Sequence, residues 1–204
     1  MVEIQVKDAE EKQQFVYECE CSEQIEEIAK DIIEIYNLIT KIQYLDFTFQ
    51  QQQCPLQGCH EDVARSLTRA LSEAQAYASK DIALNKRPLS PHVLRDHIQT
   101  IEGEVLKSQL MGFSDSNQLQ KLYSDMELLQ EDTTKLWWAG KEFLRSKRLC
   151  DYVGKNEKTK ILIKLEKPSL GSARQSVRMV VSFILTALVK ILILDKGFSY
   201  EKAS

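Results

Sequence analysis

The first fifty residues constrain the fold most, because apolar and polar residues alternate there as they do in half-buried strands. Val2, Ile4 and Val6 share one face of a predicted strand, and the acidic segment Asp8–Lys12 reads as a turn. Phe15–Tyr17 supplies a second run of residues that favour strands. Two strands joined by a polar turn predict an antiparallel hairpin.

A helix is predicted to follow, with Ser22 as its N-cap and glutamates in its first turns. Its apolar residues have the spacing of one helix face: Ile25, Ile28, Ile32 and Ile35. Ile42 to Phe49 then suggest one or two further strands, with alternation clearest from Leu45. Strand, turn, strand, helix, strand is the opening order of a β-grasp (ubiquitin-like) domain, which we therefore expect over residues 1–49.

The rest of the chain divides by composition. Residues 50–60 are rich in Gln and read as a linker, and residues 61–165 show mainly helical periodicity. Helices are expected over 61–78, from Ser90 to Val105, and over 117–148, including both tryptophans. Residues 166–204 form an atypical apolar tail. The predicted class is α+β: a small N-terminal β-grasp domain followed by a mainly helical region.

Charge is distributed unevenly. The chain has 27 Lys and Arg against 30 Asp and Glu, a net charge of −3, which gives no general reason to expect nucleic acid as a partner. The segment Lys135–Lys167 nevertheless holds ten basic and four acidic residues, a net charge of +6, and leaves −9 for the remainder. This asymmetry predicts a docking surface for an acidic partner. Equally open is a solvated basic face beside an acidic neighbouring domain.

The sequence offers little for catalysis or metal binding. The five cysteines are odd in number, which favours reduced thiols in the cytoplasm over a disulfide scaffold, and the pair Cys54 and Cys59 lacks the spacing of a zinc knuckle. Gly154-Lys155 lacks the upstream Gly and the following Ser or Thr of a phosphate-binding loop. No motif links the three histidines to a nucleophile. We therefore expect neither an enzyme, nor a bound metal, nor a cofactor.

Trp137-Trp138 gives the best indication of a binding site. On a helix, adjacent side chains point about 100° apart, so the two rings are both in the core or one is left for a partner, and the sequence leaves both readings open. Tryptophan beside arginine is typical of protein-protein hot spots. The residues expected to contact a partner are Trp138, Lys141, Arg145, Arg148, Lys155, Lys158 and Lys160.

The same region resembles a known family. Leu136–Arg145 reads LWWAGKEFLR and Asp151–Lys160 reads DYVGKNEKTK, and both runs resemble the signature of the cilia- and flagella-associated protein 298 (Kurly) family. The resemblance covers residues 1–165, weakly before Trp137 and strongly after it. It implies a non-enzymatic factor for motile cilia that acts in the cytoplasmic assembly of axonemal outer dynein arms and also in cilium positioning and planar polarity.

The implied partners are dynein assembly factors and axonemal dynein chains, and the implied locations are the cytoplasm, the cilium and the basal body. A structural microtubule- or axoneme-binding protein is the first alternative, because the basic segment could bind acidic tubulin tails. A tail-anchored membrane adaptor is the second.

The tail departs from the family, whose members continue with a polar, charged extension. Met179–Leu194 is nearly all apolar, but its 16 residues contain Lys190 and fall short of the about 20 that a bilayer span needs. We expect an alternative C-terminus first, a buried helix second and a membrane anchor third.

Overall fold

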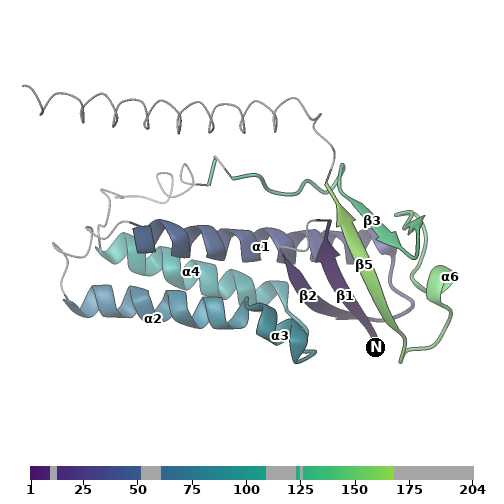
Figure 1. The fold of residues 1–204 in the computed structure, drawn as a ribbon, viewed down its shortest axis with the longest axis horizontal. Coiled ribbons are helices and arrows are strands. Elements are labelled where there is room, and N and C mark those ends of the chain that lie inside the picture. The colour runs from purple at the N-terminus through teal and green to yellow at the C-terminus, as the bar shows by residue number, and fades with distance from the viewer. Residues whose placement is uncertain (10–12, 52–60, 109–122, 125, 168–204) are drawn as a thin grey trace, which may run out of the picture. The chain divides into compact units, whose positions relative to one another are not determined.

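The computed structural model describes residues 1–9, 13–51, 61–108, 123–124 and 126–167 (Figure 1). Along the chain these form β1 (Val2–Asp8), β2 (Gln14–Cys19), α1 (Ile25–Gln51), α2 (Glu61–Tyr77), α3 (Lys80–Leu84), α4 (Pro91–Ser108), β3 (Lys135–Trp138), β4 (Lys141–Glu142), α6 (Cys150–Val153) and β5 (Lys160–Glu166). Residues Met1–Lys167 make one compact unit.

Five strands form one mixed sheet in the order β2-β1-β5-β3-β4. β1 pairs antiparallel with β2, as the predicted hairpin requires, and parallel with β5, which in turn pairs antiparallel with β3. This is the arrangement of a β-grasp sheet, and the predicted α+β class is confirmed. The central strand β5 alternates strictly, with Ile161, Ile163 and Leu165 buried and the residues between them exposed.

Helix α1 covers the inner face of the sheet. Its predicted stripe is fully buried, and it joins one hydrophobic cluster with the inner-face residues of the strands. Tyr17 in β2 donates a hydrogen bond of 2.8 Å to the carboxylate of Asp31 in α1. Desolvation and the nearby carboxylate raise the pKa of this tyrosine, which therefore stays protonated as the donor.

The strands expected over Ile42–Phe49 are absent, because α1 continues through these residues to Gln51. Ile42 and Leu45 are fully buried and extend the helical stripe that begins at Ile25, whereas Phe47 is 58% exposed. The apolar residues therefore follow a helical period, and the alternation from Leu45 to Phe49 was misleading. Of the predicted linker, residues 52–60 lie outside the described part of the chain.

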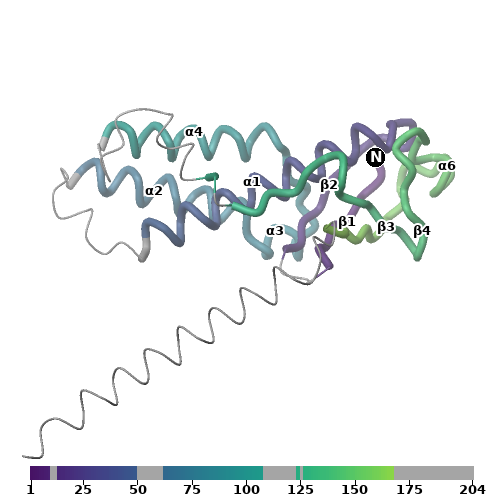
Figure 2. The backbone as a smooth tube through the Cα atoms, turned by 90° about the horizontal axis from the view of Figure 1, so that it is seen from above, coloured from purple at the N-terminus to yellow at the C-terminus, as the bar shows by residue number. Residues whose placement is uncertain are grey.

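The helices predicted over 61–78 and 90–105 are confirmed as α2 and α4, which pack against each other and against α1 (Figure 2). The buried side of α2 carries the predicted alanine-rich stripe, including Ala70 and Ala74. These helices lie in the chain between α1 and β3 and thus interrupt the β-grasp. The mainly helical region expected over 61–165 is therefore corrected: its last part returns to the sheet as β3, β4 and β5.

Asn37 holds the segment that leads into β3 against α1. Its side-chain amide donates to the carbonyl of Leu129 at 2.9 Å, and its side-chain carbonyl accepts from the backbone N–H of Leu129 at 2.8 Å. The two bonds satisfy both backbone polar groups of a buried residue that lies outside any strand.

Candidate partner-binding site

The tryptophan-bearing segment is a strand and a tight turn. The helix expected over 117–148 is therefore corrected, since none of its described residues, 123–124 and 126–148, is helical. β3 pairs with β5 on one side, and Trp137 and Trp138 pair with Glu142 and Lys141 of β4 on the other. Ala139 and Gly140 both have positive φ, 48° and 79°, as a two-residue hairpin turn requires. Aromatic residues favour strands, and β5 offers a buried ladder for Leu136, so pairing overrides the helical spacing.

The strand places the two tryptophans on opposite faces of the sheet. Trp138 lies on the inner face, half-buried against the core, with its ring centroid 6.1 Å from that of Phe143. Trp137 lies on the outer face, and its indole N–H donates to Glu166 at 2.5 Å. Neither ring is fully buried. Of the two, the predicted contact residue Trp138 is the one that packs against the core.

Two of the predicted cations are engaged within the protein. Arg145 lies 3.6 Å from Glu26 of α1, and its guanidinium donates to the carbonyls of Glu131 and Thr134, so it braces the segment before β3. Lys160 lies 2.5 Å from Glu3, its neighbour across the β1–β5 ladder. Contacts of this kind give both residues a structural role.

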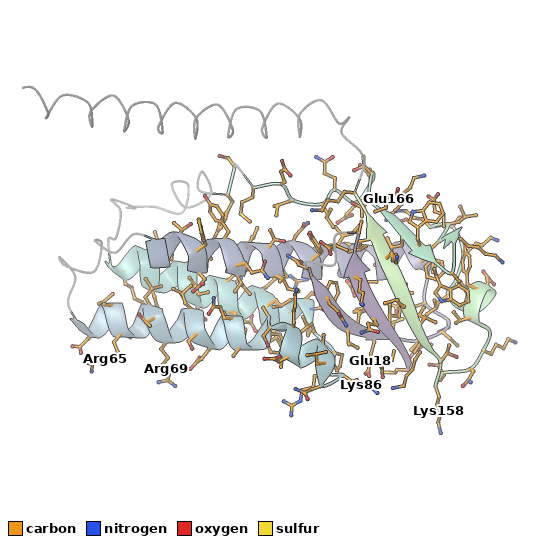
Figure 3. The ribbon with its side chains drawn as sticks, in the orientation of Figure 1. Glu18, Arg65, Arg69, Lys86, Lys158 and Glu166 are labelled. Carbon is orange, nitrogen blue, oxygen red and sulfur yellow. The ribbon has the colours of Figure 1, made fainter. Side chains whose placement is uncertain are left out.

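Four other predicted cations are exposed: Lys141, Arg148, Lys155 and Lys158. None of the four has an ion-pair partner among the residues that the structure describes. Figure 3 shows Lys158 extending away from the sheet at the end where β5 begins, opposite the end that carries Glu166. We call these four residues the basic cluster.

Backbone hydrogen bonds fix the segment that carries Arg148 to the start of α1. Ile25 N–H donates to the carbonyl of Lys147 at 2.9 Å, Leu149 N–H to that of Glu23 at 3.0 Å, and Cys150 N–H to that of Cys21 at 2.8 Å. The side chain of Leu149 in this segment is fully buried. The segment that carries Arg148 is therefore braced, which lowers the entropy lost when a partner binds there.

Tyr152 in α6 closes the other side of this scaffold. Its ring lies 4.5 Å from that of Phe143, between ring centroids, and its hydroxyl accepts from the backbone N–H of Leu144 at 2.8 Å. The ammonium of Lys147 lies 5.6 Å from the centre of the same ring. Phe143 and Tyr152 thus support this loop through ring packing and a backbone hydrogen bond.

The cysteines near the basic cluster are free thiols. Burial and nearby carboxylates raise the pKa of Cys19 to about 12. A hydrogen bond to Glu157 raises the pKa of Cys21 and lowers that of the carboxylate. Both thiols are therefore protonated near neutral pH and are poor nucleophiles. Within the described ranges, no three His, Cys, Asp or Glu side chains are grouped to hold a metal ion, while Cys54, Cys59 and His60 lie outside them.

Comparison with known proteins points to the same segment. The family model described as cilia- and flagella-associated protein 298 matches residues 134–181. A frog (Xenopus laevis) protein of this name, 298-B, is 26% identical over 84% of this chain and 77% of its own length. The mouse protein is 33% identical over 59% of this chain and 46% of its own length, and the human protein 30% over 57% and 43%.

The chain is similar to the cilia- and flagella-associated protein 298 family. The resemblance stated from the sequence is therefore confirmed. The chain spans less than half the length of the mouse and human relatives that it matches. No solved structure matches it. The part matched by the family model contains β3, β4, α6, β5 and the whole basic cluster.

Sequence reasoning placed the exposed cations correctly on the surface but missed the outer face of the sheet. The strict alternation of Lys160 to Glu166 is visible in the sequence and predicts a strand on its own. That alternation identifies the strand but not its partners β1 and β3, which come from pairing across the chain. Among the described helices, none is long and apolar enough to cross a membrane. The apolar residues 179–194 lie outside the described part of the chain.

Proposed function

We propose that this protein is a non-enzymatic adaptor of motile cilia that acts in the cytoplasmic assembly of axonemal outer dynein arms. Its relatives are named for their association with cilia and flagella, and the segment that the family model matches carries the basic cluster. The observation that carries the proposal is this set of exposed cations, none of which has an ion-pair partner among the described residues.

The basic cluster suits an acidic protein surface, such as one on a dynein chain or a dynein assembly factor. Cations without internal partners lose no existing ion pair when they meet a carboxylate. Exposed charges of this kind accelerate association and select the partner more than they add affinity. Arg145, Lys160 and Trp138 support the loop from within in this proposal, and the contact is made by Lys141, Arg148, Lys155 and Lys158.

A charge-reversal experiment tests this directly. The variant K141E/K155E/K158E removes three of the four cations, and K80E/K86E/R87E makes the same change of charge at three exposed cations around α3. We expect the first variant, tagged and expressed in ciliated cells, to recover far less axonemal dynein and assembly factor from cytosol than the wild-type chain, and the second to recover a normal amount. Equal recovery by both variants, or no dynein with the wild-type chain, refutes the proposal.

A second candidate is a structural protein of the axoneme, favoured by the same cations because tubulin tails are acidic. Co-sedimentation with microtubules distinguishes it: binding that falls steeply with salt and is lost in K141E/K155E/K158E supports this candidate. A tail-anchored adaptor, resting only on residues outside the described part of the chain, is tested by whether alkaline carbonate strips the protein from membranes.

A further inference from the structure

The outer face of the sheet, opposite α1, carries exposed apolar side chains at its centre. In Figure 1 the strands lie in front of α1, and this face is turned toward the viewer. Leu162 in β5 is 40% exposed, and the half-buried Trp137 lies diagonal to it on the neighbouring strand β3. The hydrogen bond from its indole N–H to Glu166 fixes the orientation of the ring. Leu162 and Trp137 together form a small apolar patch, and the orientation of the indole within it is fixed.

Two lysines face each other beside this apolar patch. Lys7 in β1 and Lys164 in β5 are directly opposite in the parallel ladder. Neither has an ion-pair partner within the described residues, which include Glu3 and Glu142 on the same face. Like charges directly across a ladder are destabilising. The centre of the face therefore holds two positive charges that the fold does not neutralise.

Elsewhere on this face the chain does neutralise its lysines. Lys160 lies 2.5 Å from Glu3, and Lys135 lies 3.1 Å from Glu142. Glu166, two residues after Lys164, is held by the indole of Trp137. A merely solvated face would be expected to pair its central lysines in the same way. The exception at Lys7 and Lys164 indicates a place that receives negative charge from another molecule.

We propose that this outer face, defined by Lys7, Leu162, Lys164 and Trp137, is a second docking surface and binds an acidic segment of a protein partner. One or two carboxylates lie over the opposed lysines, and an apolar side chain packs on Leu162 and the indole. Residues two apart on a strand are about 6.6 Å apart, the spacing of Lys164 and Leu162. An extended segment with an acidic residue two positions from an apolar one matches this surface.

Matched charge reversals in the whole chain test this proposal. K7E/K164E reverses the charge of the outer face, and K30E/K80E makes an equal change at two exposed lysines of α1 and α3. The probe is a fluorescein-labelled peptide that repeats Asp-Ser-Leu-Ser three times, measured by fluorescence anisotropy. Two control peptides replace every Asp by Lys or every Leu by Ser. Circular dichroism and thermal unfolding establish that each variant is folded.

We expect the acidic peptide to bind the wild-type chain, K7E/K164E to weaken binding at least tenfold, and K30E/K80E to change it less than twofold. L162S should weaken binding without altering its salt dependence. Equal weakening by the two charge pairs, equal binding of the Lys peptide, or no binding to the folded wild-type chain overturns the proposal.

Size-exclusion chromatography tests whether a second copy of this chain, and not a partner protein, covers the outer face. A wild-type dimer that K7E/K164E converts to a monomer would show that a second copy covers the face, and this also overturns the proposal. None of these outcomes decides the proposed role in dynein assembly, which depends on K141E/K155E/K158E.

Discussion

Removal of the Asn37 side chain tests how the segment before β3 is held. Asn37→Ala deletes both hydrogen bonds to the backbone of Leu129, of 2.9 and 2.8 Å. Each intramolecular hydrogen bond contributes a net of about 1 kcal/mol, and a backbone group left buried without a partner adds to the loss. Leu129 is 7% exposed, so water replaces the bonds poorly. We therefore expect the free energy of unfolding to fall by about 2 kcal/mol.

Urea unfolding of Asn37→Ala measures this loss as a lower midpoint with an unchanged slope, and thermal unfolding as a Tm lower by roughly 4–8 °C. Lys30→Ala, an exposed position on the same helix, is the control and should change stability by less than about 0.5 kcal/mol. A loss for Asn37→Ala no larger than that of the control would refute the reasoning, because it would mean that these bonds do not hold the segment.

Two further predictions concern the β3–β4 turn and the pH dependence of stability. Because φ is positive at both turn positions, Ala139→Gly should stabilise the protein by about 0.5–1 kcal/mol, and Gly140→Ala should destabilise it by about 1 kcal/mol. Chemical unfolding measures both changes, and the opposite order of stability would contradict the hairpin turn. The hydrogen bonds from Arg95 lower the pKa of Glu34 in the folded protein. The ionised carboxylate therefore stabilises the fold at pH values above its unfolded-state pKa of about 4.3. This stabilisation is lost as the pH falls through the lower folded-state pKa. The effect should stay below about 1 kcal/mol because the pair is solvated; Glu34→Gln should flatten the acid limb of the stability curve, and an unchanged limb would count against it.

The N-terminal half of the β-grasp could be predicted from local patterns. Val2, Ile4 and Val6 alternate because one face of β1 is buried, and the isoleucines from Ile25 repeat at the helical period because α1 covers that face. The end of α1 could not be read in the same way. Three alternating residues from Leu45 to Phe49 fit a strand locally, and only the packing of Ile42 and Leu45 in the helical core decides for the helix.

The β3–β4 hairpin shows why the candidate site was harder to predict than the hairpin at the start of the chain. Leu136 and Phe143 have a spacing that also suits a helix, and the turn residues Ala139-Gly140 are not among the strongest hairpin signals. What decides the structure is β5, a partner strand more than twenty residues away that pairs with β1 as well. Nonlocal pairing of this kind is invisible to a periodicity argument, although the exposure of Lys141 and Lys158 did not depend on it.

Ciliary motility offers the most direct test of the central claim, that the basic cluster contacts the partner while the residues around it build the scaffold. In ciliated cells that lack the endogenous relative, beat frequency and the number of outer dynein arms per axoneme would be measured after expression of each charge-reversed chain at equal abundance. The account predicts that K80E/K86E/R87E restores both and that K141E/K155E/K158E restores neither. Full restoration by K141E/K155E/K158E would contradict it.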